Sequence, residues 1–259
     1  MDFHPVEANL RESFRVLAKG RVHGDVLELP GLTIASLGAA FQMFNTAFLS
    51  SPVTDKADLE SRLESARLHF RSRRIEWAFW LCDGWLEGRV RRNVTQIFQR
   101  FGLRLSSEMP GMIGSPLGKP RRSLPALDMR PVNSESTLND FRAIGSVSFH
   151  VPYDWFSEVF DASVAAGQRD FLCNVGYLHG EPVATSASLR SNGVVGLYNI
   201  ATAPAYRGRG YGEAITRMTM QNALKAGEPV VLQSTSQGLR IYERLGFREV
   251  TRILVYNSI

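Results

Sequence analysis

A short segment in the second half of the chain alternates glycine with arginine and tyrosine: Arg207-Gly208-Arg209-Gly210-Tyr211-Gly212. It lies between a strand-like run that ends near Ala201 and an amphipathic run that begins near Gly210. Glycines let a backbone turn sharply and present several N–H groups to one point, and the start of a helix adds a positive dipole end. The segment is therefore predicted to hold a diphosphate. Its two arginines either contact that anion or face solvent, and the sequence leaves both open.

The surroundings of this glycine-rich turn weaken the competing interpretations of it. A tight strand-to-helix connection needs glycine for geometry alone, so the segment by itself does not decide between packing and phosphate binding. A Walker loop requires Gly-Lys followed by Ser or Thr, which the segment lacks. A dinucleotide fingerprint requires parallel strands, whereas the preceding runs are separated by the hairpin signal Asn192-Gly193 and predict antiparallel pairing.

Two motifs together resemble those of the GCN5-related N-acetyltransferases (GNAT). The segment from Tyr198 to Gly212 is similar to the family's acetyl-CoA motif, Arg/Gln-x-x-Gly-x-Gly/Ala. The segment from Thr235 to Phe247 is similar to its terminal helix with a Tyr-x-x-x-Gly-Phe ending. The matched positions are Arg207, Gly210 and Gly212 in the first motif and Tyr242, Gly246 and Phe247 in the second.

The resemblance implies an enzyme that moves an acetyl group from acetyl-CoA to an amine by direct attack in a ternary complex, with no metal. The pantetheine arm would pair with backbone groups at the end of a strand, like an added strand in a splayed sheet. The acceptor would be a small-molecule or peptide amine. The positions implied to bind the cofactor are Ile200, Ala201, Thr202, Arg207, Gly208, Arg209, Gly210, Tyr211, Gly212 and Thr235, the last standing where many relatives carry asparagine.

Tyr242 is the residue that the resemblance assigns to catalysis, as the acid that protonates the departing thiolate of CoA. The alternative is that Tyr242 is a core aromatic residue whose hydroxyl reaches solvent. The proton acceptor departs from the family pattern, because Tyr198 and Asn199 occupy the strand where relatives often have glutamate. Proton removal would then go through ordered water or a substrate amine of lowered pKa, with His150 and His179 as possible relays. The missing carboxylate also motivates the alternative of a non-catalytic acyl-CoA-binding or sensor protein.

Periodicity predicts alternating strands and helices in the second half, of the mixed α+β class. The resemblance implies a mostly antiparallel, splayed sheet flanked by helices. Tyr153, Trp155 and Phe156 are candidates for a substrate lid, because their region borders the acceptor pocket in the family. The expected elements are strand 127–132, helices 136–143 and 152–166, strands 171–178, 182–189 and 194–201, helix 210–226, strand 230–233, helix 238–245 and strand 248–256.

The first half carries a faint copy of the second. Residues 97–103 read like residues 241–247, and each run follows a strand-like segment. This predicts a tandem of two related folds with a degenerate first copy, which lacks the arginine-glycine loop and has Phe98 in place of the tyrosine. Helices at 58–70 and 87–100 and a strand at 76–81 are expected there. Three tryptophans either line a cleft between the halves or belong to the hydrophobic core: Trp77, Trp80 and Trp85.

Composition bounds the remaining possibilities. The 259 residues suit two domains, here residues 1–110 and 126–259 joined by a proline- and glycine-rich linker at 111–125. Cys82 and Cys173 form no CxxC pair, the start of the chain lacks a signal-peptide pattern, and no membrane span is apparent, so a cytoplasmic protein is expected. The oligomeric state is left open. Nucleic-acid binding is not favoured, because the net charge of +5 comes from short runs typical of solvated faces, made of Arg71, Arg73, Arg74, Arg89, Arg91, Arg92, Arg121 and Arg122.

Overall fold

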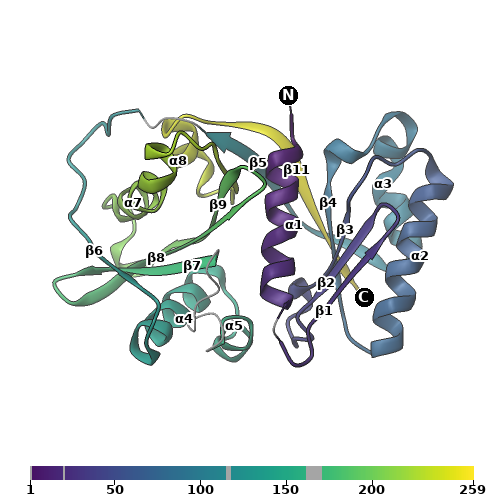
Figure 1. Cartoon of the computed structure of the whole chain (residues 1–259), viewed down its shortest axis with the longest axis horizontal. Helices are drawn as coiled ribbons and strands as arrows, with labels where there is room; N and C mark the ends of the chain where they lie inside the picture. The colour runs from purple at the N-terminus through teal and green to yellow at the C-terminus, as the bar shows by residue number, and fades with distance from the viewer. Residues whose placement is uncertain (1, 20, 115–117, 162–170) are drawn as a thin grey trace. The chain divides into compact units, whose positions relative to one another are not determined.

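The computed structural model describes residues 2–19, 21–114, 118–161 and 171–259 (Figure 1). Internal contacts divide the chain into two compact units. The N-terminal unit comprises Met1–Gly111 together with Glu249–Ile259, and the C-terminal unit comprises Met112–Arg248. Two units were predicted, but the last strand was expected in the second of them. The structure instead groups most of this strand with the first unit.

The N-terminal unit is a mixed sheet with three helices. Its strands follow the order β1-β2-β3-β4-β11-β5. Neighbouring strands pair antiparallel from β1 to β3 and between β4 and β11, whereas β3 and β4 are parallel. The elements are α1 (His4–Ala18), β1 (Asp25–Leu29), β2 (Leu32–Ser36), β3 (Asn45–Leu49), α2 (Lys56–Arg73), β4 (Ala78–Cys82), α3 (Gly88–Arg100), β5 (Leu103–Gly114) and β11 (Phe247–Ser258).

Successive residues of β4 hold helices on opposite faces of this sheet, because side chains alternate along a strand. Phe79 packs edge-on against Phe98 of α3, with ring centroids 5.1 Å apart. Trp80 packs against Phe14 of α1 at 5.0 Å. Trp77 and Trp85 are buried. The tryptophans for which a cleft was considered therefore belong to the packing of the N-terminal unit.

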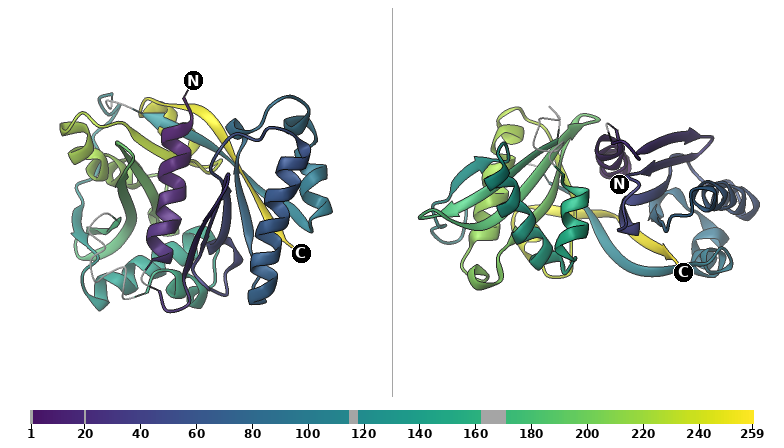
Figure 2. Two further views of the ribbon diagram at one scale, coloured as in Figure 1. Left: turned by 45° about the vertical axis from the view of Figure 1, so that its right-hand side comes forward. Right: turned by 90° about the horizontal axis from the view of Figure 1, so that it is seen from below.

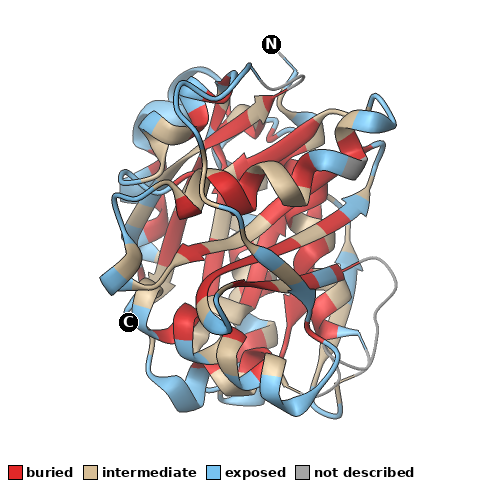
Figure 3. Ribbon diagram, turned by 90° about the vertical axis from the view of Figure 1, so that its left-hand side faces the viewer, coloured by how far each residue is buried: buried red, intermediate tan, exposed pale blue. Residues whose placement is uncertain are grey.

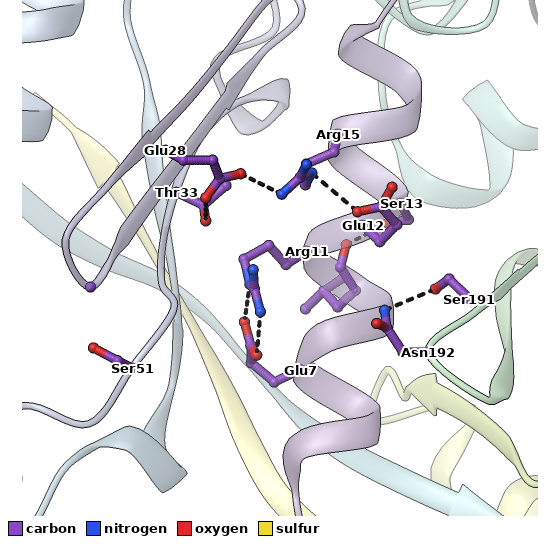
Figure 4. Close-up of polar contacts among 12 residues, drawn as sticks. Glu7, Arg11, Glu12, Ser13, Arg15, Glu28, Thr33, Ser51, Ser191 and Asn192 are labelled. Carbon is purple, nitrogen blue, oxygen red and sulfur yellow. Dashed lines mark hydrogen bonds and ion pairs between the residues drawn. The ribbon is translucent and has the colours of Figure 1, made fainter.

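Charged side chains tie α1 to the hairpin of β1 and β2 (Figure 4). Arg15 pairs with Glu28 of β1, and the Thr33 hydroxyl of β2 donates to the same carboxylate at 2.6 Å. Within the helix, Arg11 Nε donates to the buried Glu7 carboxylate at 2.8 Å. Burial raises the pKa of Glu7, and the Arg11 guanidinium offsets part of that increase. The helix is thus held by paired charges as well as by Phe14.

Asp83 fixes β11 to the N-terminal unit. Its Oδ1 accepts the Thr251 hydroxyl at 2.8 Å and the Arg252 backbone N–H at 3.0 Å, and its Oδ2 pairs with Arg91. The side chain is almost buried, so removing it leaves the Thr251 hydroxyl and the Arg252 backbone N–H without this acceptor, whereas the exposed Arg91 is solvated by water. We expect Asp83→Ala to lower the free energy of unfolding by about 3 kcal/mol.

The measurement is urea unfolding followed by tryptophan fluorescence, since Trp77, Trp80 and Trp85 all lie in this unit. Glu181→Ala, at an exposed position of the other unit, serves as the control and is expected to cost less than about 0.5 kcal/mol. Equal midpoints for the two variants would contradict the role assigned to Asp83.

The C-terminal unit has the strand order β10-β9-β8-β7-β6. All pairs within it are antiparallel except β9 with β10, so the predicted mostly antiparallel sheet is confirmed. The elements are β6 (Asp128–Pro131), α4 (Glu135–Phe149), α5 (Tyr153–Val159), β7 (Phe171–Leu178), β8 (Glu181–Ser191), β9 (Val194–Thr202), α7 (Tyr211–Lys225), β10 (Val230–Gln233) and α8 (Leu239–Arg244).

Helices cover both faces of this second sheet (Figure 2). α4 packs on β7, β8 and β9, whereas α7 packs on β8, β9 and β10. Neighbouring residues of β7 show the division: the Tyr177 hydroxyl donates to Asp140 of α4 at 2.6 Å, while Gly176 faces Ile215 of α7. Figure 3 shows the buried residues concentrated along the strands between these layers.

Two sequence predictions need correction. The helix expected at 152–166 is α5, which ends at Val159, and residues 162–170 lie outside the described part of the chain. The linker expected at 111–125 begins inside β5, which continues to Gly114. Glycines occur there because a Cβ would stand 2.6 Å from the Thr251 side chain at Gly111 and 2.8 Å from the Phe247 ring at Gly114. They mark close packing in a strand and not a break in it.

The two units repeat one order of elements. Three antiparallel strands, a helix, a parallel strand, a second helix and a last strand follow one another in each, from β1 to β5 and from β7 to β11. The matched ends agree in detail, since α3 and α8 are both followed by a left-handed glycine, Gly102 at φ 73° and Gly246 at φ 91°. The predicted repetition of the fold is thus confirmed. The two repeats differ in their last strands, because β11 follows the C-terminal unit in the chain but pairs with β4 of the N-terminal unit.

Candidate cofactor site

The sheet of the C-terminal unit opens between β9 and β10. Pairing between them covers only Val195 to Leu197, although β9 continues to Thr202. A bulge starts the opening, because Asn199 and Ile200 stand opposite Ser186 alone and Asn199 adopts φ 49°. Bulges bend a strand and redirect its edge. The backbone of residues 198–202 is therefore not paired with β10. This separation of the two strands is what the expected splayed sheet requires.

The glycine-rich loop follows directly on this open edge. Gly208 and Gly210 adopt φ 77° and φ 94°, which side chains disfavour, and the first intrahelical bond of α7 runs from Ala214 N–H to the Gly210 carbonyl at 2.9 Å. Within the described residues no protein acceptor is hydrogen-bonded to the backbone N–H groups at the helix start, those of Gly208, Arg209, Gly210, Tyr211 and Gly212. Such a set of amides is the usual partner of an anion at a helix N-terminus.

Side chains around the loop divide into packing and charge. Tyr211 is buried in a cluster with Val183, Ala184 and Ile215, so only its backbone can reach a ligand. Arg207 and Arg209 are exposed, and Arg207 Nε donates to the Thr202 carbonyl at 3.2 Å. The remaining cofactor positions lie at the end of β9: Ile200 is partly buried, Ala201 is buried, and Thr202 Oγ1 lies 3.3 Å from the Cβ position of Gly212.

The corresponding helix start in the N-terminal unit is closed by its own acids. Asp55 caps α2 by accepting the Asp58 backbone N–H at 2.9 Å, and Asp58 in turn accepts the Thr54 backbone N–H at 2.9 Å. A phosphate there would meet two carboxylates at the positive end of the helix dipole. These acids make the start of α2 unfavourable for an anion, and the segment that precedes it also lacks the glycines of the loop before α7.

Tyr242 lies on α8 and is nearly buried, at 9% exposure. Its ring meets Phe247 edge-on at 5.7 Å and belongs to a core cluster with Leu232 and Leu245. Burial alone raises the pKa of its hydroxyl, and no protein hydrogen bond to that hydroxyl is present among the described residues. The ring is therefore core, and the hydroxyl stays protonated and available as a donor. Its counterpart Phe98 is fully buried and has no hydroxyl to offer.

A comparison with known protein families assigns part of this unit. The family model described as "Acetyltransferase (GNAT) domain" matches residues 169–249, which contain the splay, the loop and Tyr242. Residues 169–249 are a GNAT domain. No curated protein matches the chain significantly.

Solved structures similar to the whole chain extend the likeness of fold to both units. A GCN5-related N-acetyltransferase from Kribbella flavida is 19% identical with a TM-score of 0.72, over 97% of this chain and 95% of that one. A tandem GNAT protein from the clavulanic acid biosynthesis pathway is 11% identical with a TM-score of 0.58, over 98% and 92%. A putative GNAT-family acetyltransferase from Novosphingobium aromaticivorans is 18% identical with a TM-score of 0.53, over 90% and 89%. At these identities the likeness concerns the fold.

The other positions considered for proton transfer and for cofactor contact lie in different surroundings. Tyr198 stacks near Phe171 with ring centroids 6.0 Å apart, and the Asn199 carbonyl accepts the Thr185 hydroxyl at 2.9 Å. His150 ends α4 and His179 lies in the turn after β7, and both are exposed. The Thr235 hydroxyl oxygen accepts the Gly238 backbone N–H at 3.2 Å and so helps to start α8.

Of the suggested lid residues, Tyr153 and Trp155 are exposed at 44% and 42%. Phe156 is instead buried against Phe141 and Phe160, so it is a packing residue of the C-terminal unit. Among the described residues, no cluster of His, Cys, Asp and Glu is placed to hold a metal, and no helix has the length and apolar character needed to cross a membrane.

Both cysteines are buried, and burial raises the pKa of each thiol, to about 12 for Cys82. We expect neither to react with the disulfide reagent DTNB at pH 8 until the protein is unfolded in guanidinium, where both react. Because the folded pKa of Cys82 is raised from 9.0, the thiol stabilises the fold below pH 9.0, and this contribution is lost as the pH rises toward about 12. Rapid labelling of one thiol in the folded protein would contradict its burial.

Proposed function

We propose that this chain is an N-acetyltransferase that transfers the acetyl group of acetyl-CoA to the amine of a small molecule or peptide. The observation that carries the proposal is the row of backbone N–H groups without protein acceptors at the start of α7, directly after the open edge of β9, within a GNAT domain. The loop would hold the diphosphate, and residues 200–202 would pair with the pantetheine arm.

The reaction would proceed by direct attack of the amine on the thioester carbonyl carbon. The new C–N bond forms as the C–S bond breaks, and the departing CoA sulfur takes a proton from the Tyr242 hydroxyl. The ammonium formed on the acceptor loses its proton to water, because residues 198 and 199 of β9 provide no carboxylate. Tyr242 is later reprotonated from solvent, so that charge and protons balance over one turnover.

Two measurements test this proposal. Calorimetry with acetyl-CoA establishes binding, and the release of free CoA thiol, followed with a panel of small amines and amine-bearing peptides, establishes turnover. Binding together with amine-dependent release would support the enzyme. Absence of binding would overturn the whole assignment.

A non-catalytic acyl-CoA-binding protein is the second candidate, favoured by Tyr198 and Asn199, which provide no carboxylate at these positions of β9. It would bind acetyl-CoA as tightly as the enzyme would. It would release no CoA with any amine, so that turnover with one defined amine eliminates it.

A further inference from the structure

Residues 118–125, which precede β6, lie along the start of α7. We call residues 118–125 the strap. At one end of the strap, the Gly118 carbonyl accepts Arg217 Nη1 of α7 at 2.8 Å. At the other end, a Cβ placed on Gly210 would be 3.3 Å from Pro125 Cδ and 3.6 Å from Leu124 Cδ2. The segment expected to be a free linker is therefore seated against the loop that precedes α7.

The strap brings a cation to that loop. Arg122 Nη2 lies 3.3 Å from the same Cβ position of Gly210, which places the guanidinium beside the first amides of the helix. Arg122 is exposed, and no hydrogen bond or ion pair of its side chain is present among the described residues. A second arginine at the strap, Arg217, is already paired with a carboxylate, that of Glu213 at 2.9 Å.

Packing within the C-terminal unit does not account for the position of Arg122. A cation beside the positive end of a helix is unfavourable unless an anion shares the site. An arginine held for packing would find a carboxylate or a carbonyl, as Arg217 does with Glu213 and Gly118. A guanidinium is well suited to phosphate, to which it donates two parallel hydrogen bonds.

We propose that Arg122 is a phosphate-binding residue of the acetyl-CoA site, supplied by the strap and directed to the diphosphate that the loop holds. This inference rests on the proposed function and adds to it a residue outside the matched domain, residues 169–249. The strap is attached at both ends, and Leu127, just beyond it, packs on the cluster that contains Ile215. Part of the ordering needed to place the guanidinium is therefore already present before the ligand binds.

The test is calorimetry of the full chain with CoA at low and moderate salt. Arg122→Gln is expected to weaken binding about tenfold or more, since it removes charge-assisted hydrogen bonds. It should also make the affinity less sensitive to salt. Arg121→Gln is the matched control: Arg121 is the neighbouring exposed arginine, it does not supply any of the three atoms nearest the Cβ position of Gly210, and its replacement should leave the affinity within about twofold.

A parallel titration with dephospho-CoA, which lacks the 3′-phosphate, separates the two kinds of phosphate on the cofactor. A loss that persists with dephospho-CoA supports contact with the diphosphate. A loss that vanishes with it overturns that assignment. If Arg122→Gln has the circular dichroism and melting temperature of the parent and binds CoA with the same affinity, the inference about Arg122 is overturned. The proposed function would still stand in that case, because the parent binds CoA. Absence of binding by the parent would remove both.

Discussion

Valine in place of Gly210 is expected to weaken acetyl-CoA binding at least about a hundredfold. Gly210 adopts φ 94°, a region that a β-branched residue scarcely enters, and its Cβ would approach Arg122 Nη2 and Pro125 Cδ at 3.3 Å. The exposed Arg122 side chain can move aside, but the strain of the positive φ is relieved only by turning the loop amides away from their common point. Two lost hydrogen bonds to a charged group, at about 1.5 kcal/mol or more each, account for the expected effect.

Gly193→Val is the matched control for backbone strain. Gly193 has φ 72° in the turn between β8 and β9, with open space around its Cβ position, and lies at the other end of β9 from the loop. Both variants should lose stability in thermal unfolding because both force valine into a left-handed conformation. Only Gly210→Val should lose affinity in calorimetry. Equal affinities for the two proteins would remove the loop from the binding site.

What the sequence predicted well was local. The loop, the helix that follows it and the Tyr242 helix are each contained in a dozen or so residues, so glycine spacing and periodicity suffice to find them. The turn at Asn192-Gly193 was found for the same reason, and the structure gives positive φ at both residues. These are features that a short stretch of chain determines largely by itself.

What the sequence could not supply depends on partners far away in the chain. Gly111 and Gly114 resemble a linker until Thr251 and Phe247 are seen to fill the space beside them. The placement of most of β11 in the N-terminal unit likewise depends on a long-range pairing, of Leu254 with Leu81 for example, that no local pattern encodes. Strand pairing is a matter of register between distant segments, and periodicity does not determine it.

Arg122 was missed for a related reason. In the sequence it stands in a proline-rich stretch beside Arg121, and the two are indistinguishable as members of a solvated basic run. The course of the strap separates them, because it places Arg122 Nη2 among the atoms nearest the Cβ position of Gly210, at 3.3 Å. The asymmetry of the two units is, by contrast, partly visible in the sequence. Asp55 and Asp58 stand at the start of one helix where the other has glycines.

Tyr242→Phe is expected to lower kcat about a hundredfold with the best acceptor amine, while the Kd for acetyl-CoA stays within about twofold. The substitution keeps the ring that packs on Phe247 and Leu245 and removes only a hydroxyl that makes no protein hydrogen bond among the described residues. The departing CoA sulfur would then have to take its proton from water. Steady-state kinetics and calorimetry on the same preparations measure the two quantities.

Tyr256→Phe provides the control, since Tyr256 is a buried tyrosine of the N-terminal unit whose hydroxyl, within the described part of the chain, is hydrogen-bonded only to the Thr95 hydroxyl at 3.3 Å. It should change stability slightly and kcat not at all. An unchanged kcat for Tyr242→Phe would leave Tyr242 as a core residue and move the acid elsewhere.

The pH dependence offers a second check on Tyr242. An acid must be protonated to act, so its loss would appear as a fall in kcat when the pH rises through its pKa. Burial raises the pKa of Tyr242 above the ordinary value of 10.0, so this group should cause no such fall below pH 10.0. A rise of kcat with pH at lower values would instead report deprotonation of the acceptor amine, and Tyr242→Phe should retain that rise at a lower plateau. A variant whose whole profile shifts along the pH axis would contradict the assignment, because it would mean that Tyr242 itself titrates in the working range.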